Sequence, residues 1–205
     1  PVTTCTLRCH YCYITQHRLF DGPLPKFHFS PEHVRKALSK ERLGGPCLIN
    51  LCGGGEILLA PQLVDYIRVL LEEGHYVMVV TNATVSKRFE ELAKLPKELL
   101  SHLFFKFSYH YLELKQRNLL DKFFANVCLM RDSGASFTLE ATPNDELIPY
   151  IEEMKQAAIN HVGAVNHLTI GRDERVAGAL PILTDMSREE YKKTWSVFHS
   201  EFFDY

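Results

Sequence analysis

The segment Cys5-Thr6-Leu7-Arg8-Cys9-His10-Tyr11-Cys12 places three cysteines close together, with the spacing C-x3-C-x2-C. Soft thiolate ligands select iron–sulfur clusters, Cu(I) or zinc. A tight loop of this kind can hold three corners of a 4Fe–4S cube, whose usual ligands are four cysteines. No fourth cysteine lies in this segment, so one iron would stay open to an external ligand. A zinc site that adds His10 or His17 to the three cysteines is the alternative, and the segment alone leaves both open.

A second polar motif follows the apolar run Leu48–Leu51, which we predict to be a short buried strand. The motif reads Cys52-Gly53-Gly54-Gly55-Glu56. Glycine has no side chain, so Gly54 and Gly55 let the backbone approach a ligand closely. The carboxylate of Glu56 can pair with a ligand ammonium through a charge-assisted hydrogen bond. Taken alone, the motif is also typical of an ordinary turn.

The other three cysteines, Cys47, Cys52 and Cys128, lie singly in apolar or Gly-rich surroundings. Disulfide scaffolds belong to short secreted chains that cannot build a core, and a chain of 205 residues can build one. We therefore expect a metal site together with scattered buried thiols, in a reducing compartment. Free cysteines often act as small hydrophobic residues, which is how we interpret these three, although Cys52 lies close to the predicted site.

The cysteine spacing, the aromatic Tyr11 directly before Cys12 and the later Gly54-Gly55-Glu56 together resemble the radical S-adenosylmethionine (SAM) superfamily. This resemblance implies that Cys5, Cys9 and Cys12 hold a 4Fe–4S cluster whose open iron binds the amino and carboxylate groups of SAM. It implies that Glu56 and the backbone at Gly54 and Gly55 orient the SAM ammonium. Tyr11 takes the aromatic position of the motif, beside the cofactor.

The same resemblance implies a reaction. An external electron donor, similar to flavodoxin or ferredoxin, reduces the cluster, and SAM is cleaved to methionine and a 5′-deoxyadenosyl radical. That radical takes a hydrogen atom from a substrate, while the protein positions the reactants and excludes water.

Further site residues follow from the resemblance at strand ends. Asn82 matches a polar residue near SAM, with helix capping as the alternative. Ser108 matches a polar SAM-binding position, and Glu140 and Thr142 are candidates for contacts with the ribose; a structural role is the alternative for each. Arg172 and Arg175 are candidates for the SAM carboxylate, with ordinary solvated loop arginines as the favoured alternative. Tyr109, His110 and Tyr111 are candidates for a substrate pocket, with ordinary core or rim packing as the favoured alternative.

Short apolar runs alternate with amphipathic stretches along the chain, as in βαβ units with a parallel sheet. We expect six strands, at Pro1–Thr4, Leu48–Leu51, Tyr76–Val80, Leu103–Tyr109, Ser136–Thr142 and His167–Ile170. We expect helices at 30–38, 61–73, 86–93 and 114–132, one that starts between Asp145 and Pro149, and one that starts at Ser187. The right-handed crossover rule leaves few topologies. The prediction is an α/β fold, an open partial (β/α)6 TIM-like barrel with parallel strands, and a doubly wound sheet is second.

We expect residues 1–205 to be a single radical SAM core domain, cropped at an N-terminus that lacks Met and with a C-terminal extension missing or never present. The composition, 46% hydrophobic and 23% charged with a net charge of −2, is that of an ordinary globular protein. No basic block or long apolar run occurs, so we expect no nucleic-acid partner, no membrane association and a cytoplasmic location.

The substrate does not follow from the sequence. A peptide or protein side chain and a carbohydrate-type metabolite are both compatible with it, as is a glycyl-radical partner. A function of another class is also open, namely a non-catalytic iron–sulfur electron-transfer module or a zinc-binding module. Such a module has no use for the Gly-Gly-Glu motif.

Overall fold

The computed structural model describes residues 4–19, 22–24, 27–176 and 178–200. Five parallel strands form one sheet, and each strand pairs with the next strand along the chain. They are β1 (Leu48–Leu51), β2 (Tyr76–Thr81), β3 (Leu103–Ser108), β4 (Ser136–Ala141) and β5 (His167–Leu168). A doubly wound sheet reverses its strand order at a switch point, and this sheet does not. The fold is therefore α/β, and it is the predicted open partial barrel.

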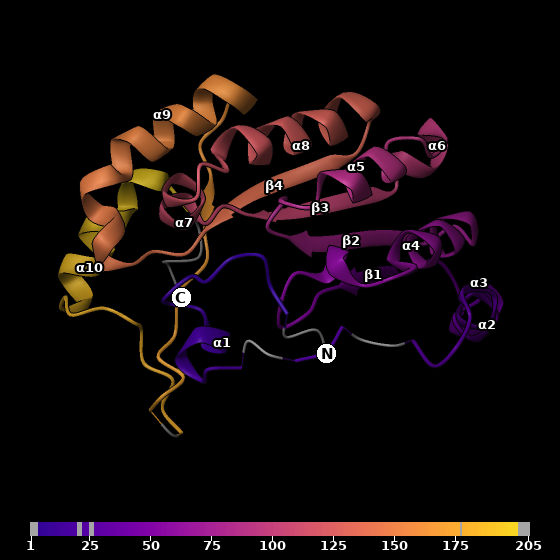
Figure 1. Ribbon diagram of the computed structural model, residues 1–205, viewed down its shortest axis with the longest axis horizontal. Coiled ribbons are helices and arrows are strands. Elements are labelled where there is room, and N and C mark those ends of the chain that lie inside the picture. Colours follow the sequence, from indigo (N-terminus) through magenta and orange to yellow (C-terminus); the bar gives the residue numbers. More distant parts are fainter. Residues whose placement is uncertain (1–3, 20–21, 25–26, 177, 201–205) are drawn as a thin grey trace.

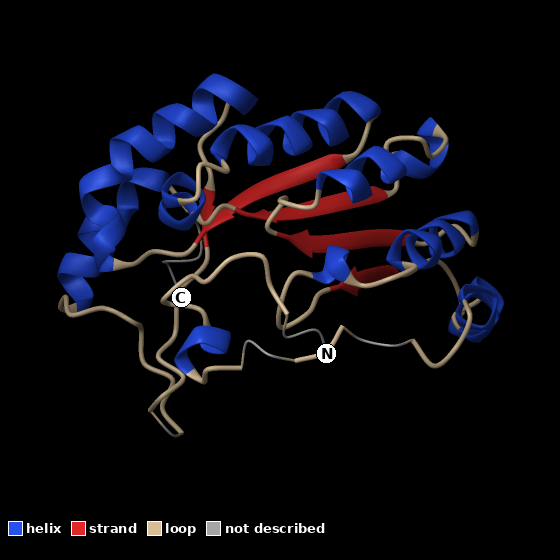
Figure 2. Ribbon diagram, in the orientation of Figure 1, coloured by secondary structure: helices blue, strands red, loops and turns tan. Residues whose placement is uncertain are grey.

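Helices connect the strands and cover one side of the sheet, while the segment that contains the three cysteines runs past the carboxyl ends of the strands (Figure 1). Figure 2 shows the strands enclosed between this helical layer and the loops on the other side. The α-helices are α1 (Tyr13–Gln16), α2 (Pro31–Ala37), α3 (Lys40–Leu43), α4 (Leu63–Glu72), α5 (Ser86–Leu92), α6 (Lys97–Leu100), α7 (Tyr111–Gln116), α8 (Leu120–Ser133), α9 (Ile151–Val162) and α10 (Arg188–Trp195). Short 3-10 helices occur at η1 (Ile57–Leu59), η2 (Asp145–Tyr150) and η3 (Ser196–Phe198).

The core lies between the sheet and the helices. Side chains of a strand alternate between the two faces of its sheet, and on β3 Phe105 and Phe107 are 1% and 0% exposed. Phe89 of α5 packs against both rings. On the opposite face of β3, Phe104 is 37% exposed and Lys106 and Ser108 are half-buried. The face turned away from the helices is therefore the more polar one, which suits a surface beside a binding site.

Local sequence signals predict several helix starts correctly. Ser30 caps α2, with Pro31 as its first residue, as expected. Ser187 and Glu190 form the expected capping box at the start of α10. The predicted helix near Asp145 begins there as the 3-10 helix η2, which accommodates Pro149, and continues as α9.

Two predictions about these elements are wrong. The single helix expected over residues 114–132 is two helices, α7 and α8, separated at Asn118. Asn118 has φ 55°, a left-handed conformation that Asn tolerates better than most residues. Leu119 N donates to Leu114 O at 2.8 Å, which closes the end of α7. The strand Leu48–Leu51 was expected to be buried, but its residues are half-buried or exposed, and Leu48 is 60% exposed. The predicted strand Pro1–Thr4, which would flank β1, lies outside the described residues except for Thr4.

None of the helices in the described ranges combines the length and the apolar composition that a membrane span requires.

We predict that Phe107→Ala lowers the free energy of unfolding by about 3–5 kcal/mol, because it removes a fully buried ring and leaves a cavity. Phe104→Ala is the matched control on the same strand, and we expect it to cost less than about 1 kcal/mol. Urea unfolding of the two variants measures the difference. Equal losses would show that the core does not lie on the face of β3 that carries Phe107.

Candidate functional site

The three cysteines of the motif lie in one loop, which we call the cysteine loop (residues 4–12), and α1 follows it directly. Cys9 is buried, and Cys5 and Cys12 are half-buried. Cys12 N donates to Cys9 O at 3.1 Å, which turns the backbone between these two residues. Cys12 then occupies the N-cap position of α1, without a capping hydrogen bond from its side chain. The loop is thus compact and does not extend away from the protein.

Burial and neighbouring charges both act on the thiols of the cysteine loop. Burial raises the pKa of Cys9, and the nearby thiols of Cys12 and Cys5 raise it further. Burial also raises the pKa of Cys5, to which Glu56 and Cys12 add. Among the described residues, no three His, Cys, Asp or Glu side chains converge as ligands of one metal ion. A 4Fe–4S cluster binds each thiolate through a different iron, so its ligands need no such convergence, and three neighbouring thiols in one turn fit it.

The cysteine loop is fixed to the carboxyl end of β2 by Asn82. The Asn82 side-chain nitrogen donates to Thr6 Oγ1 at 2.9 Å and to Cys5 Sγ at 3.5 Å. Its side-chain oxygen accepts from the backbone nitrogen and the hydroxyl of Thr84, at 3.2 and 2.7 Å. Thr6 and Thr84 also share a hydrogen bond of 2.7 Å. Asn82 is 4% exposed, so the expected polar residue forms part of a buried network that reaches the sulfur of Cys5.

The backbone after β2 has an unusual conformation that presents Asn82 to the loop. Ala83 has φ 57°, in the left-handed region that is rare for residues with a side chain. Asn126 of α8 holds this turn, because its side-chain nitrogen donates to Ala83 O at 2.8 Å. Ala83 and Asn126 are 0% and 4% exposed, so packing against α8 maintains the conformation.

Glu56 lies beneath this network and is 1% exposed. One carboxylate oxygen, Oε1, accepts from Leu58 N at 3.0 Å and from Thr81 Oγ1 at 2.7 Å. The other, Oε2, accepts from Asn82 N at 2.8 Å. Burial raises the pKa of Glu56, and these three hydrogen bonds oppose that rise. Glu56 therefore links η1 to β2 and the residue after it through hydrogen bonds. Gly54 and Gly55 precede it in the half-buried turn after β1.

Tyr11 connects the cysteine loop to the end of β3. Its hydroxyl lies 2.7 Å from His110 Nδ1. A hydrogen bond from Tyr11 lowers the pKa of Cys9, against the larger effect of burial. Burial lowers the pKa of His110 to about 4, so this imidazole is neutral at pH 7. Glu113 of α7 adds a second link, because its carboxylate accepts from Arg8 N at 2.8 Å.

Ser108, Glu140 and Thr142 lie at or directly after the ends of the neighbouring strands β3 and β4. Among the described residues, none of their hydrogen bonds reaches the cysteine loop. Ser108 and Glu140 are register partners on β3 and β4. The Glu140 carboxylate pairs with Lys106 at 2.7 Å and accepts from Thr169 Oγ1 at 2.5 Å. Thr142 is half-buried, and its carbonyl accepts from the side chain of Asn144 at 3.0 Å.

The remaining candidates lie apart from this network. Arg175 pairs with Asp173, and Arg172 donates to Leu180 O at 3.3 Å, so both side chains bind their own segment. Cys52 is exposed, which makes the expectation of a buried thiol wrong for this residue; Cys47 and Cys128 are half-buried. Cys52 is exposed because the turn after β1 lies at the edge of the sheet.

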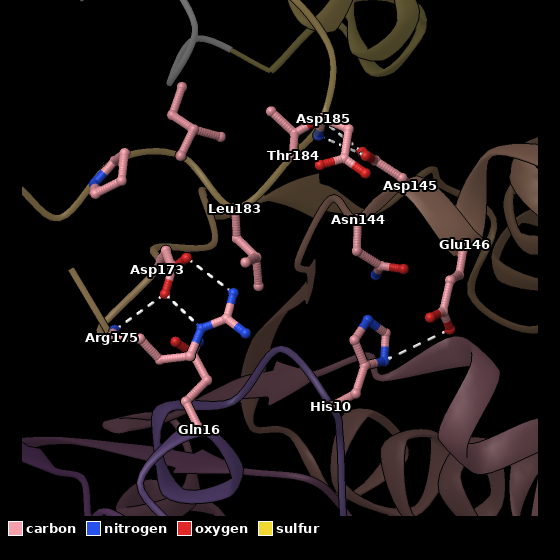
Figure 3. Close-up of a pocket in the computed structure, with 12 residues that line it drawn as sticks. His10, Gln16, Asn144, Asp145, Glu146, Asp173, Arg175, Leu183, Thr184 and Asp185 are labelled. Atoms are coloured by element: carbon pink, nitrogen blue, oxygen red, sulfur yellow. Dashed lines mark hydrogen bonds and ion pairs between the residues drawn. The ribbon is translucent and has the colours of Figure 1, made fainter.

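A pocket of about 630 Å³ opens beside the cysteine loop, within the size range of small-molecule sites. Figure 3 shows its side chains converging from three segments: the cysteine loop with α1, the start of η2, and the chain after β5. The lining residues are His10, Gln16, Asn144, Asp145, Glu146, Asp173, Arg175 and residues 181–185. Gln16 joins two of the segments, because its amide donates to Arg172 O at 3.0 Å and accepts from Glu174 N at 2.8 Å.

Residues 1–140 match the family described as the radical SAM superfamily. The chain belongs to this superfamily. Its members use a 4Fe–4S cluster and SAM, which agrees with the three thiols at the carboxyl edge of the sheet. No curated protein sequence matches the chain.

Solved structures show the same fold at low sequence identity. SuiB from Streptococcus suis is 16% identical with a TM-score of 0.62, and the match covers 94% of this chain and 42% of SuiB. The structure titled native anSMEcpe with bound AdoMet is 14% identical with a TM-score of 0.65, covering 96% and 57% of the two chains. SuiB bound to S-adenosylmethionine has a TM-score of 0.60 at 14% identity, covering 94% and 40%. The radical SAM chain thus spans less than two thirds of each of these proteins.

Sequence reasoning missed several residues of this site. Thr6, Thr81, Thr84 and Asn126 complete the hydrogen bonds around Asn82 and Glu56. Thr81 and Thr84 flank Asn82 in the segment Thr81-Asn82-Ala83-Thr84, and this density of small polar residues after a strand was the available signal. Asn126 offered none, because a single Asn within an amphipathic helix is ordinary.

We predict that Asn82→Ala lowers the free energy of unfolding of the metal-free chain by about 1–3 kcal/mol, because it leaves buried partners in Thr6 and Thr84 unsatisfied. Asn160→Ala, at an exposed position on α9, is the control and should change stability by less than about 0.5 kcal/mol. Thermal or urea unfolding monitored by circular dichroism gives both values. Equal stability of the two variants would show that the hydrogen bonds of Asn82 to Thr6 and Thr84 do not stabilise the fold.

Proposed function

We propose that this chain is the catalytic core of a radical SAM enzyme, in which Cys5, Cys9 and Cys12 bind a 4Fe–4S cluster. The observation that carries the proposal is the attachment of the thiol-bearing loop, through Asn82 and Tyr11, to the carboxyl ends of β2 and β3. When bound and reduced, the cluster supplies the electron that cleaves SAM, and the resulting 5′-deoxyadenosyl radical takes a hydrogen atom from the substrate.

Glu56 is our proposed anchor for the SAM ammonium. A carboxylate has about four acceptor positions, and the described contacts use two on Oε1 and one on Oε2. One position on Oε2 therefore remains for a charged donor. Gly54 and Gly55 bring the backbone of the same turn alongside, where side chains would keep a ligand at a distance.

Other residues take supporting roles in this proposal. Tyr11 presents its ring beside the cofactor, and its hydroxyl is oriented by His110. Asn82 orients Cys5, and Ser108, Glu140 and Thr142 supply polar groups toward the SAM ribose from the ends of β3 and β4. Glu140 is held in place for this by Lys106.

An external reductant similar to flavodoxin or ferredoxin supplies the electrons in this proposal, within a reducing compartment such as the cytoplasm. The substrate is a peptide or protein side chain, or a carbohydrate-type metabolite. One related structure, SuiB, was solved with a precursor peptide bound; at 15% identity it supports a shared fold and is compatible with the first class.

We predict that anaerobic reconstitution with iron and sulfide gives a brown protein with about four irons per chain. After reduction and addition of SAM, it should release 5′-deoxyadenosine. Cys9→Ala should abolish both the colour and the release, because it removes a cluster ligand. Iron analysis and chromatography of the products measure these outcomes.

Cys128→Ala is the matched control, since Cys128 is a half-buried thiol on α8, outside the cysteine loop. It should keep both the cluster and the release of 5′-deoxyadenosine. Zinc in place of iron in anaerobically prepared protein would favour the zinc-binding module. A cluster that forms but never cleaves SAM would favour an electron-transfer module.

We predict that Glu56→Gln keeps the cluster but weakens SAM binding about tenfold or more, because a charge-assisted hydrogen bond is lost. The control is Glu91→Gln, which removes a carboxylate that pairs with Arg88 on α5. Calorimetric titration of the reconstituted proteins with SAM gives the affinities, and iron content confirms the cluster. An unchanged SAM affinity in the Glu56 variant would show that Glu56 does not bind the SAM ammonium.

A further inference from the structure

The pocket beside the cysteine loop has an excess of negative charge. Four of its lining side chains are carboxylates, at Asp145, Glu146, Asp173 and Asp185, and one is an arginine, Arg175. Arg175 binds both carboxylate oxygens of Asp173, each at 2.8 Å, and holds the pKa of that carboxyl at about 2. This pair is neutral as a unit, so Asp145, Glu146 and Asp185 determine the charge of the pocket.

The hydrogen bonds of these three carboxylates in the described structure do not neutralise them. Asp145 accepts from the hydroxyl of Thr184 at 2.6 Å and from Asp185 N at 2.8 Å, and both donors are uncharged. Glu146 faces the imidazole of His10 at 3.6 Å, beyond normal hydrogen-bond length. An anionic ligand would be repelled here, and a cationic ligand would be attracted.

Asn144 gives independent evidence that the pocket receives a ligand. It is 3% exposed, and its side-chain nitrogen donates to Thr142 O at 3.0 Å. This bond fixes the amide orientation, since the reverse orientation would bring two acceptor oxygens together. The side-chain oxygen then has no hydrogen-bond partner among the described residues. Figure 3 shows the Asn144 side chain directed into the space among Leu183, His10 and Glu146.

A buried carbonyl oxygen calls for a hydrogen-bond donor, and the surrounding carboxylates favour a donor that carries a positive charge. A primary ammonium group satisfies both, because it carries three donors and one charge. A neutral donor would satisfy Asn144 and leave the charge of the three carboxylates uncompensated.

We propose that this pocket binds a primary ammonium group of the substrate, with Asn144 Oδ1 as an acceptor and Glu146 and Asp185 as counter-charges. The inference rests on the proposed function, because His10 and Gln16 bring the pocket against the cysteine loop. Glu56, the proposed anchor for the SAM ammonium, does not line this pocket, so the two cationic groups occupy separate places. The ammonium is that of a lysine side chain in a peptide or that of a free alkylamine.

The test is calorimetric titration of the metal-free and the reconstituted chain with defined probes. Acetyl-Ala-Lys-Ala-amide and n-butylamine represent the two sources of the ammonium. Acetyl-Ala-Lys(Nε-acetyl)-Ala-amide is the neutral control. We expect at least one amine probe to bind about tenfold or more tightly than the neutral peptide, with a preference that shrinks as NaCl rises from about 50 mM to about 500 mM. Binding of the lysine peptide alone assigns the peptide source, and binding of n-butylamine assigns the free amine.

Variants connect the binding to the named residues. Asn144→Leu removes the acceptor at similar volume, and Glu146→Gln removes a charge at an exposed position where folding is not at risk. Both should weaken amine binding severalfold and leave the neutral peptide unaffected. Glu152→Gln, an exposed carboxylate on α9 outside the pocket, is the matched control and should change neither affinity.

The proposal would be overturned if neither the lysine peptide nor n-butylamine bound more tightly than the neutral peptide. Displacement of the amine by S-adenosylhomocysteine would also overturn it, because that result would assign the pocket to SAM. Its failure is separable from failure of the proposed function. A wild-type chain that forms the cluster and cleaves SAM, yet binds neither amine probe more tightly than the neutral peptide, would contradict only the ammonium site. A chain that binds the amine without forming a cluster would contradict only the proposed radical SAM reaction.

Discussion

The buried link from Glu56 through Asn82 to Cys5 is the interaction on which the site depends. Glu56 accepts from the backbone of Asn82, and the Asn82 side chain reaches the sulfur of Cys5 and the hydroxyl of Thr6. A loop of cysteines has no regular structure of its own, so its shape comes from such contacts. Because this link is buried, water does not compete for its hydrogen bonds. The position of the thiols is thereby tied to the position of β2, in the centre of the hydrophobic core.

Parallel topology explains why one loop can be held from so many directions. Carboxyl ends of parallel strands lie at the same edge of a sheet, and the segments after them face a common space. The cysteine loop and α1 contact the segments after successive strands: Glu56 after β1, Asn82 after β2, His110 after β3, Glu146 after β4 and Glu174 after β5. Each contact alone is modest in free energy. Together they place thiols, polar side chains and the acidic pocket within one region.

Sequence predicted those parts of the structure that depend on neighbouring residues. The spacing of Cys5, Cys9 and Cys12, the capping box at Ser187 and the alternation of strands and helices are all local, and the family and the fold followed from them. What sequence did not predict arises from contacts between distant segments. Glu56 was expected to face a ligand, and in the structure it also braces Thr81 and Asn82. Asn144 carried no local signal, because its importance comes from an unpaired oxygen. The exposure of β1 depends on its position at the sheet edge.

Negative charge around Cys5 and Cys9 adds to the effect of burial on their pKa values. Glu56 raises the pKa of Cys5, and Glu113 raises that of Cys9, in addition to the effect of burial. Metal ligation requires the thiolate form, so burial and these carboxylates both act against deprotonation of Cys5 and Cys9. Both carboxylates are engaged by backbone N–H groups, of Asn82 and of Arg8, so they cannot turn away from the thiols without losing those bonds. Glu56 and Glu113 therefore help to position the cysteine loop and also add negative charge beside its thiols.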